Sequence, residues 1–236
     1  REHKNILKLC TKILNLKSRI YKFKILIVDD SEDLKTQNLI RNCSLKKNIF
    51  FEKRFKKSGR GSAVLSGMKF FLNKKNNFSC FVEMDADLSH NPDELIRNLN
   101  YFNFKNSDLL IASRYIKKSK ILNWPVSRKI LSYFSNMLAR LLLKIPASDY
   151  TNGYRIYSSR AVRCCVKNCG KIGDGFIILS EILLHLSLNK FKINEMETTF
   201  VNRTRGISSV NIGLIFYSLI GLIKFFFIKI KIKKNL

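Results

Sequence analysis

Short apolar runs alternate with helix-like segments through the first half of the chain, and this rhythm constrains the fold more than any other feature. The predicted strands lie at 24–28, 48–52, just before Asp85 and at 109–112, and the predicted helices at 4–17, 33–43, 59–72 and 92–102. Such an order is typical of a mostly parallel sheet whose strands are joined by helices. With 236 residues and 46% hydrophobic content, the chain is long enough for one α/β domain with an appendage.

Two of the predicted strands end in pairs of acids. Asp29 and Asp30 follow one strand, and Asp85 and Asp87 follow another. Residues two apart in an extended segment point the same way, so Asp85 and Asp87 can both reach a hard divalent cation, whose other ligands are often phosphate oxygens. Because ligands bind outside the carboxyl ends of strands in open α/β sheets, we expect both acidic pairs to form one site. The alternative is that Asp87, Ser89 or Asn91 caps the helix that begins at Pro92.

Net charge and cysteine content narrow the function classes. The net charge of +27 comes with abundant Asn, Ile and Phe, a bias that AT-rich coding produces without any binding role, although an anionic partner is the alternative. No RNA-binding or zinc-finger signature accompanies the charge, so we expect no nucleic-acid partner. The six cysteines form no C-x-x-C pair, which predicts neither a zinc site nor a disulfide framework.

The second half of the chain places cations where the first half places acids. Arg114 follows the strand at 109–112, and Arg128, Ser132 and Asn136 recur every four residues on a predicted helix at 127–143. That spacing forms one polar stripe, which is either a binding surface or a solvated face. Later, the loop 202–206 contains Arg203 and Arg205, whose guanidinium donors suit a phosphate.

Several segments, taken in chain order, carry a resemblance to a known family. They are Val28-Asp29-Asp30, Gly59-x-Gly61-x-Ala63-x-x-x-Gly67, Met84-Asp85-Ala86-Asp87-Leu88-Ser89-His90, Ser113-Arg114-Tyr115, Trp124-Pro125 with Arg128 and Ser132, Gly153-Tyr154-Arg155, and Phe200 to Gly206. With them the chain resembles the family-2 glycosyltransferases, within which it is most similar to the polyprenol-phosphate (dolichol-phosphate) mannosyltransferase-like branch. The Asp-Ala-Asp-Leu-Ser-His string is the most specific of these segments.

The resemblance implies an α/β fold of GT-A type, a Rossmann-like nucleotide-sugar-binding domain with a mostly parallel sheet over residues 1–209. It implies an inverting, metal-dependent transfer of a sugar, mannose from GDP-mannose, to a polyprenyl or dolichyl phosphate. Asp85 and Asp87 would hold Mg²⁺ or Mn²⁺, and Asp87, Arg114, Arg128 and Ser132 would be catalytic, the last three receiving the lipid phosphate. The implied donor contacts are Glu2, Ile27, Asp29, Asp30, Met84, Asp85, Ala86, Arg203 and Arg205.

Departures from the family pattern keep two alternatives open. The acidic turn at 29–36 lacks the usual glycine, Ser208-Ser209 stands where Ser-Lys is common, and Leu179 stands where a Gln is common. A bactoprenol-type glucosyltransferase that uses a UDP-sugar is one alternative. A catalytically impaired relative that acts as a scaffold is the other.

The C-terminal residues 210–236 suggest contact with a membrane. The apolar stretch 212–223 is shorter than the ~20 residues that a spanning helix needs, so we expect it to lie at the membrane interface. The lysines that follow suit an anionic membrane surface, and we expect association with the cytoplasmic face. A terminal helix packed on the domain is the alternative.

The resemblance also implies that a first strand is missing. Members of the family open with a strand and a turn, whereas residues 1–6 here are similar to the end of that turn and the start of its helix. We therefore expect a gap in the sheet beside the strand at 24–28, with unpaired backbone groups along it.

Overall fold

A computed structural model describes residues 3–54, 59–73, 78–171, 175, 177–202, 221–227 and 230 of the chain. The elements, in chain order, are α1 (His3–Leu14), β1 (Ile25–Asp29), α2 (Lys35–Arg41), η1 (Lys46–Asn48), β2 (Ile49–Lys53), α3 (Gly59–Leu72), β3 (Cys80–Glu83), η2 (Pro92–Glu94), α4 (Leu95–Phe104), β4 (Leu109–Ser113), β5 (Lys120–Leu122), α5 (Val126–Leu143), β6 (Arg155–Ser158), α6 (Ser159–Asn168), α7 (Ile178–Leu188), β7 (Ile193–Glu197) and β8 (Thr199–Val201).

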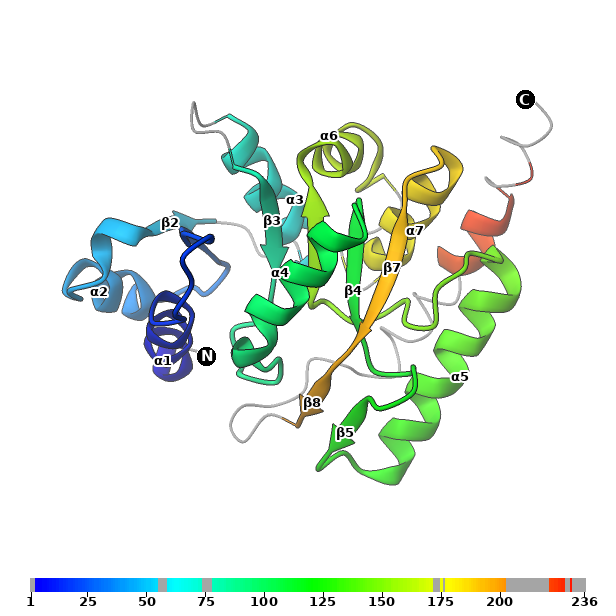
Figure 1. Cartoon of the computed structure of the whole chain (residues 1–236), viewed down its shortest axis with the longest axis horizontal. Coiled ribbons are helices and arrows are strands. Elements are labelled where there is room, and N and C mark those ends of the chain that lie inside the picture. Colours follow the sequence, from blue (N-terminus) through cyan, green and yellow to red (C-terminus); the bar gives the residue numbers. More distant parts are fainter. Residues whose placement is uncertain are drawn as a thin grey trace.

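A four-stranded sheet with the order β3-β6-β4-β7 forms the centre of the molecule (Figure 1). β4 and β7 are parallel, whereas β6 is antiparallel to both of its neighbours, with Tyr157 opposite Phe81 on one side and Leu109 on the other. Two smaller parallel pairs, β1-β2 and β5-β8, flank this sheet. Three of the five strand pairs in the described residues are therefore parallel, and β6 is the strand that departs from the predicted pattern.

Both faces of the central sheet are covered by helices, which explains why the inner strand β4 reads as a continuous apolar run. All five residues of β4 are buried. Leu109 and Ile111 pack into the cluster formed with α3, α6 and α7, while Leu110 and Ala112 pack on the opposite face against α4. Figure 1 shows α4 crossing in front of the sheet, with α6 and α7 on the other side. The alternation follows from the two-residue period of a strand.

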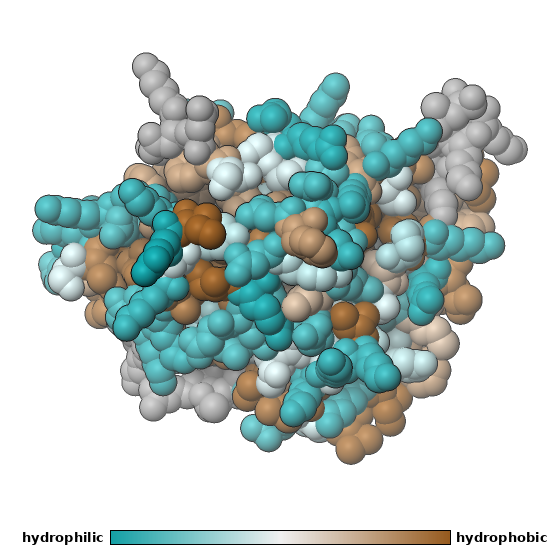
Figure 2. Space-filling view, viewed as in Figure 1, coloured by the Kyte–Doolittle hydropathy of each residue, from teal (hydrophilic) through white to brown (hydrophobic). Residues whose placement is uncertain are grey.

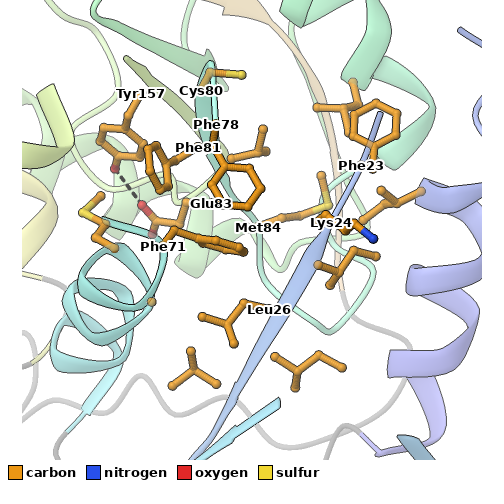
Figure 3. A pocket seen from close by; sticks show the side chains of 18 of the residues that line it. Phe23, Lys24, Leu26, Phe71, Phe78, Cys80, Phe81, Glu83, Met84 and Tyr157 are labelled. Carbon is orange, nitrogen blue, oxygen red and sulfur yellow. Dashed lines mark hydrogen bonds between the residues drawn. The ribbon is translucent and has the colours of Figure 1, made fainter. Parts of the chain in front are cut away.

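A cavity of about 480 Å³ separates β1 from β3. Figure 3 shows Leu26 on one wall, facing Phe71, Phe81 and Met84 across the space. Among the described residues no backbone ladder joins β1 or β2 to the central sheet. That a first strand is missing beside β1 stays a prediction.

Most of the C-terminal segment 210–236 falls outside the described residues. Residues 221–227 are helical, and Leu222 and Phe225 are buried in the same core cluster as α6 and α7. For this short part, packing on the domain is the better description, while an interfacial position for the whole segment and the boundary at 209 stay predictions. Within the described ranges, no helix has both the length and the apolar character needed to cross a bilayer.

Candidate active site

The loop that follows β3, residues 84–90, carries Asp85 and Asp87 and is called the acidic loop below. The backbone N–H of Asp85 donates to Nδ1 of His90 (3.1 Å), and the N–H of Ser89 donates to Oδ1 of Asp87 (3.0 Å). Leu88 has a φ of 62°, a left-handed conformation that is uncommon for a residue with a side chain. Such strain costs on the order of 1–3 kcal/mol and persists only where the surroundings impose it. Of the three residues that the sequence offered as caps for the helix at Pro92, Asn91 is the one that caps η2, and its side chain accepts from the backbone N–H of Asp93.

His90 anchors the acidic loop to the core. It is 1% exposed, and its Nε2 lies 3.0 Å from Oδ1 of Asn152. Because Nδ1 accepts the Asp85 N–H, Nε2 carries the proton and donates to Asn152. The ring also stacks on Tyr154 at 5.5 Å and meets the edge of Phe200 at 5.4 Å. The ring of His90 therefore fixes the backbone of Asp85 in position.

Asp85 also faces a guanidinium that the sequence did not indicate. Nε and Nη2 of Arg60, in the first turn of α3, donate to Oδ1 of Asp85 at 3.1 and 3.0 Å. Arg60 Nη2 also lies 2.6 Å from Oε1 of Glu83. No local pattern links Arg60 to an acid 25 residues later, since the contact exists only once α3 packs beside β3.

A second group of side chains, called the arginine cluster, contains Arg114, Tyr115, Trp124, Arg128 and Ser132. Arg114 lies 5.4 Å and Arg128 lies 4.2 Å from the centre of the Trp124 ring, both within the range of a cation–π contact. The hydroxyl of Tyr115 donates to Ser132 Oγ (2.6 Å). The structure thus brings together Arg114, which follows β4, and Arg128 and Ser132 from α5, and their role as acceptor contacts stays a prediction.

Arg114 is held by a buried carboxylate. Its Nε and Nη2 donate to Asp149 at 2.8 Å each, and Nη2 also donates to Thr151 Oγ1 (2.6 Å). Burial is the largest single influence on the pKa of Arg114 and lowers it, but the charge and hydrogen bonds of Asp149, with smaller contributions from Tyr115 and Asp85, together raise that pKa above its ordinary value. In the same way, burial raises the pKa of Asp149, and Arg114 more than offsets this and lowers it. Both groups are therefore charged at neutral pH.

Phe200 joins the acidic loop to the arginine cluster. Its ring lies 5.4 Å from His90, 5.3 Å from Trp124 and 5.4 Å from the guanidinium carbon of Arg114. The acids and the cations thus border one region of the molecule. Asn136, the third member of the predicted stripe on α5, is turned inward instead: it is 4% exposed and its Oδ1 accepts from the backbone N–H of Tyr150.

The residues predicted to contact the donor lie in two different surroundings. Ile27, Met84 and Ala86 line the cavity between β1 and β3. Asp29 and Asp30, at the end of β1, pair instead with Lys53 and Arg54 at the end of β2, with 3.3 Å between Lys53 Nζ and Asp29.

The two acidic pairs, Asp29 with Asp30 and Asp85 with Asp87, share no hydrogen-bond partner among the described residues. A single site containing both pairs therefore stays a prediction. Glu2, Arg203 and Arg205 lie outside the described residues, so their predicted donor contacts stay predictions too.

The acidic loop fits a hard divalent cation in its chemistry. It offers two carboxylates within one turn, and a cation such as Mg²⁺ commonly takes one or two carboxylates and completes its shell with phosphate oxygens and water. Within the described part of the chain, no group of three or more His, Cys, Asp or Glu side chains is arranged to hold a metal on its own.

One family of glycosyltransferases matches this chain. Residues 1–166 match the model of glycosyl transferase family 2. The polyprenol monophosphomannose synthase of Mycolicibacterium smegmatis is 33% identical over 189 residues, which cover 79% of this chain and 70% of that protein. The undecaprenyl-phosphate mannosyltransferase of Micrococcus luteus is 32% identical over 163 residues, which cover 69% of this chain and 65% of that protein.

Among solved structures, glucosyl-3-phosphoglycerate synthase from Mycobacterium tuberculosis, in complex with Mn²⁺, uridine diphosphate and glucosyl-3-phosphoglycerate, matches with a TM-score of 0.62. The match covers 95% of this chain and 76% of that chain at 13% sequence identity. At this identity the likeness confirms the GT-A-like α/β fold and nothing about the substrate.

Proposed function

The chain belongs to glycosyl transferase family 2, and from that membership we propose that it transfers a sugar from a nucleotide-diphosphate sugar to a polyprenyl phosphate. The names of the two relatives favour mannose as the sugar and a polyprenyl phosphate as the acceptor. GDP-mannose is the donor that we propose on this basis.

The observation that carries the proposal is the arginine cluster beside the acidic loop. A phosphate monoester needs cations and hydroxyl donors, and Arg114, Arg128 and Ser132 supply both within one cluster. A metal-bound diphosphate needs hard oxygen ligands, which Asp85 and Asp87 supply. Phe200 spans the two groups, so an acceptor phosphate and a donor diphosphate held there would lie next to each other.

The chemistry requires no side chain that acts as a nucleophile. An ionised lipid phosphate attacks the anomeric carbon, the new carbon–oxygen bond forms as the bond to the diphosphate breaks, and the anomeric configuration inverts. The main task of the chain is to position the two substrates, with Arg128 and Arg114 orienting the acceptor phosphate. Asp85 and Asp87 would hold Mg²⁺ or Mn²⁺, which would stabilise the negative charge of the departing diphosphate.

Release of nucleoside diphosphate, measured with GDP-mannose and with UDP-glucose and a short-chain polyprenyl phosphate, tests this proposal. We expect metal-dependent release with GDP-mannose that requires the acceptor. Asp87→Asn should abolish most of the turnover while the fold is retained, whereas Asp93→Asn, the same change at an exposed acid in η2, should not. Release with UDP-glucose alone would identify the glucosyltransferase alternative. Tight binding of nucleotide and lipid without release would favour the scaffold alternative.

A variant on the acceptor side distinguishes binding of the lipid phosphate from binding of the nucleotide. Arg128→Ala should raise the KM for the lipid phosphate at least about tenfold, the equivalent of one lost charged hydrogen bond, and leave nucleotide affinity unchanged. Arg163→Ala, which removes an exposed cation from α6, is the control. Equal losses for both substrates would show that Arg128 does not belong to the acceptor side.

The surface of α5 supports a membrane-embedded acceptor. Val126, Ile130, Tyr133, Phe134 and Leu141 form an apolar stripe along α5, and each is more than half exposed. In Figure 2, brown residues gather at the lower right of the molecule, over the place that α5 occupies in Figure 1. Exposed Lys129, Arg140 and Lys144 accompany the stripe, the combination found in helices that lie in a membrane interface. We propose that this helix rests on the membrane and presents Arg128 and Ser132 to the lipid phosphate.

A further inference from the structure

Arg60 occupies a position that is unexpected for a cation. Its guanidinium donates twice to Asp85 Oδ1, at 3.1 and 3.0 Å, and pairs with Glu83 at 2.6 Å, with 18% of the side chain exposed. A guanidinium stays protonated in proteins, so a permanent positive charge lies against one of the two carboxylates that the proposed function assigns to a metal ion.

The surroundings of Arg60 are built around its guanidinium. A Cβ atom at Gly153 would lie 1.7 Å from Nη2 and 2.7 Å from Cζ of Arg60, so only a glycine at this position leaves room for the side chain. On the far side, the hydroxyl of Tyr157 donates to Oε2 of Glu83 at 2.6 Å, as the dashed line in Figure 3 shows. Glu83 is thus fixed by β6 on one side and pairs with Arg60 on the other. These contacts form a continuous chain from Tyr157 through Glu83 and Arg60 to Asp85.

A cation in this place opposes the binding of a second cation at Asp85. Two like charges a few ångströms apart repel by several kcal/mol at the effective dielectric of a protein surface. The diphosphate of a nucleotide sugar brings negative charge to the same place and offsets that repulsion. Metal and nucleotide would then bind far better together than either does alone, which is a positive coupling between two ligands.

We propose that Arg60 is an internal counter-ion of Asp85 that makes binding of a divalent cation conditional on the donor diphosphate. Arg60 is a positioning residue in this account, acting through Asp85 and not on the sugar. The inference rests on the proposed function, since it takes Asp85 as a ligand of the donor-bound metal. Its consequence is that the chain does not hold a metal ion tightly until the donor arrives.

Binding of Mn²⁺ to the whole chain, followed by electron paramagnetic resonance with and without GDP or UDP, tests the inference. The wild-type chain should bind Mn²⁺ weakly alone and much more tightly with a nucleoside diphosphate. Arg60→Gln should bind Mn²⁺ alone at least about tenfold more tightly. A tenfold change corresponds to about a third of the Coulomb energy between two unit charges about 4 Å apart at an effective dielectric of 20. The coupling between Mn²⁺ and nucleotide should fall by the same factor, and Arg60→Lys should restore it.

Two glycine variants give an independent arm. Gly153→Ala should displace the guanidinium from Asp85 without removing its charge, and it should tighten Mn²⁺ binding in the same direction as Arg60→Gln. Gly67→Ala adds the same methyl group to α3 where the nearest atoms lie at 3.5 Å, and it should leave Mn²⁺ affinity unchanged. If Arg60→Gln does not fold because Glu83 loses its partner, Gly153→Ala, which keeps both charges, carries the test.

The outcomes separate this inference from the proposed function. Unchanged or weaker Mn²⁺ affinity in a folded Arg60→Gln protein, with normal nucleotide-dependent binding in the wild type, would overturn the counter-ion role alone. A wild-type chain that binds no Mn²⁺ even with GDP or UDP would overturn both the counter-ion role and the metal-dependent part of the proposed function. Tightened Mn²⁺ binding in the variant would support the counter-ion role whether or not sugar transfer is detected.

Discussion

Replacing Asp149 with Asn tests how much of the fold depends on one buried carboxylate. Asp149 is fully buried and accepts hydrogen bonds from the backbone N–H, Nε and Nη2 of Arg114, at 3.0, 2.8 and 2.8 Å. It also accepts from the backbone N–H groups of Thr151 and Asn152, at 3.1 and 2.9 Å. Asn keeps the shape but removes the charge and turns an NH₂ group toward some of these donors.

The expected cost follows from the loss of one partner in a buried ion pair. Such a loss typically lowers the free energy of unfolding by about 3–5 kcal/mol, because the remaining charge stays buried without compensation. Total stabilities of single domains are about 5–15 kcal/mol, so the variant should unfold at a much lower urea concentration. Asp93→Asn, which removes a surface partner of Lys12, should change stability by less than about 1 kcal/mol.

Urea unfolding of Asp149→Asn, Arg114→Met and the double variant at pH 7 provides the measurement. The double variant should be more stable than the sum of the two single losses predicts, because it leaves no buried charge uncompensated. The pKa of Asp149 is held below its usual value, so its contribution is present above the unfolded pKa of about 4 and is lost as pH falls through the folded pKa. If the free energy of unfolding of Asp149→Asn lay within about 1 kcal/mol of wild type at pH 7, the buried pair of Asp149 with Arg114 would not carry the stability assigned to it.

Two further predictions concern the cavity and the membrane. A five-residue Val- and Ile-rich strand, the length of β1, joined by a linker ahead of residue 1 should fill the cavity between β1 and β3. It should raise the thermal midpoint by several degrees and tighten nucleotide binding, since each buried apolar side chain contributes ~1.5–3 kcal/mol; an equal effect from a Ser- and Gly-rich segment would contradict this. The double variant Ile130→Asp with Phe134→Asp should reduce binding to anionic liposomes, measured by flotation, at least about tenfold. The control Phe104→Asp, at a side chain 78% exposed on α4, should bind as the wild type does. Unchanged binding of the α5 variant would exclude this helix as the membrane contact.

The sequence alone determined the features that depend on neighbouring residues. Apolar runs placed β1, β3 and β4 close to their observed bounds, with acids following β1 and β3, and the polar spacing on α5 predicted its length and the common position of Arg128 and Ser132. The ordered motifs identified the family, which the comparisons confirmed. These features follow from the period of a strand or helix and from the residues that begin or end these elements, so a single sequence is sufficient to show them.

Only the tertiary structure decided which distant groups meet. The antiparallel insertion of β6 between β3 and β4, the burial of Asn136 against Tyr150 and the pairs Arg60 with Asp85 and Arg114 with Asp149 join residues that no local pattern connects. A guanidinium has the same sequence signature whether it faces solvent, a substrate phosphate or a buried carboxylate. Its partner is chosen when the helices and strands pack, because burying one charge is favourable only where the opposite charge arrives beside it.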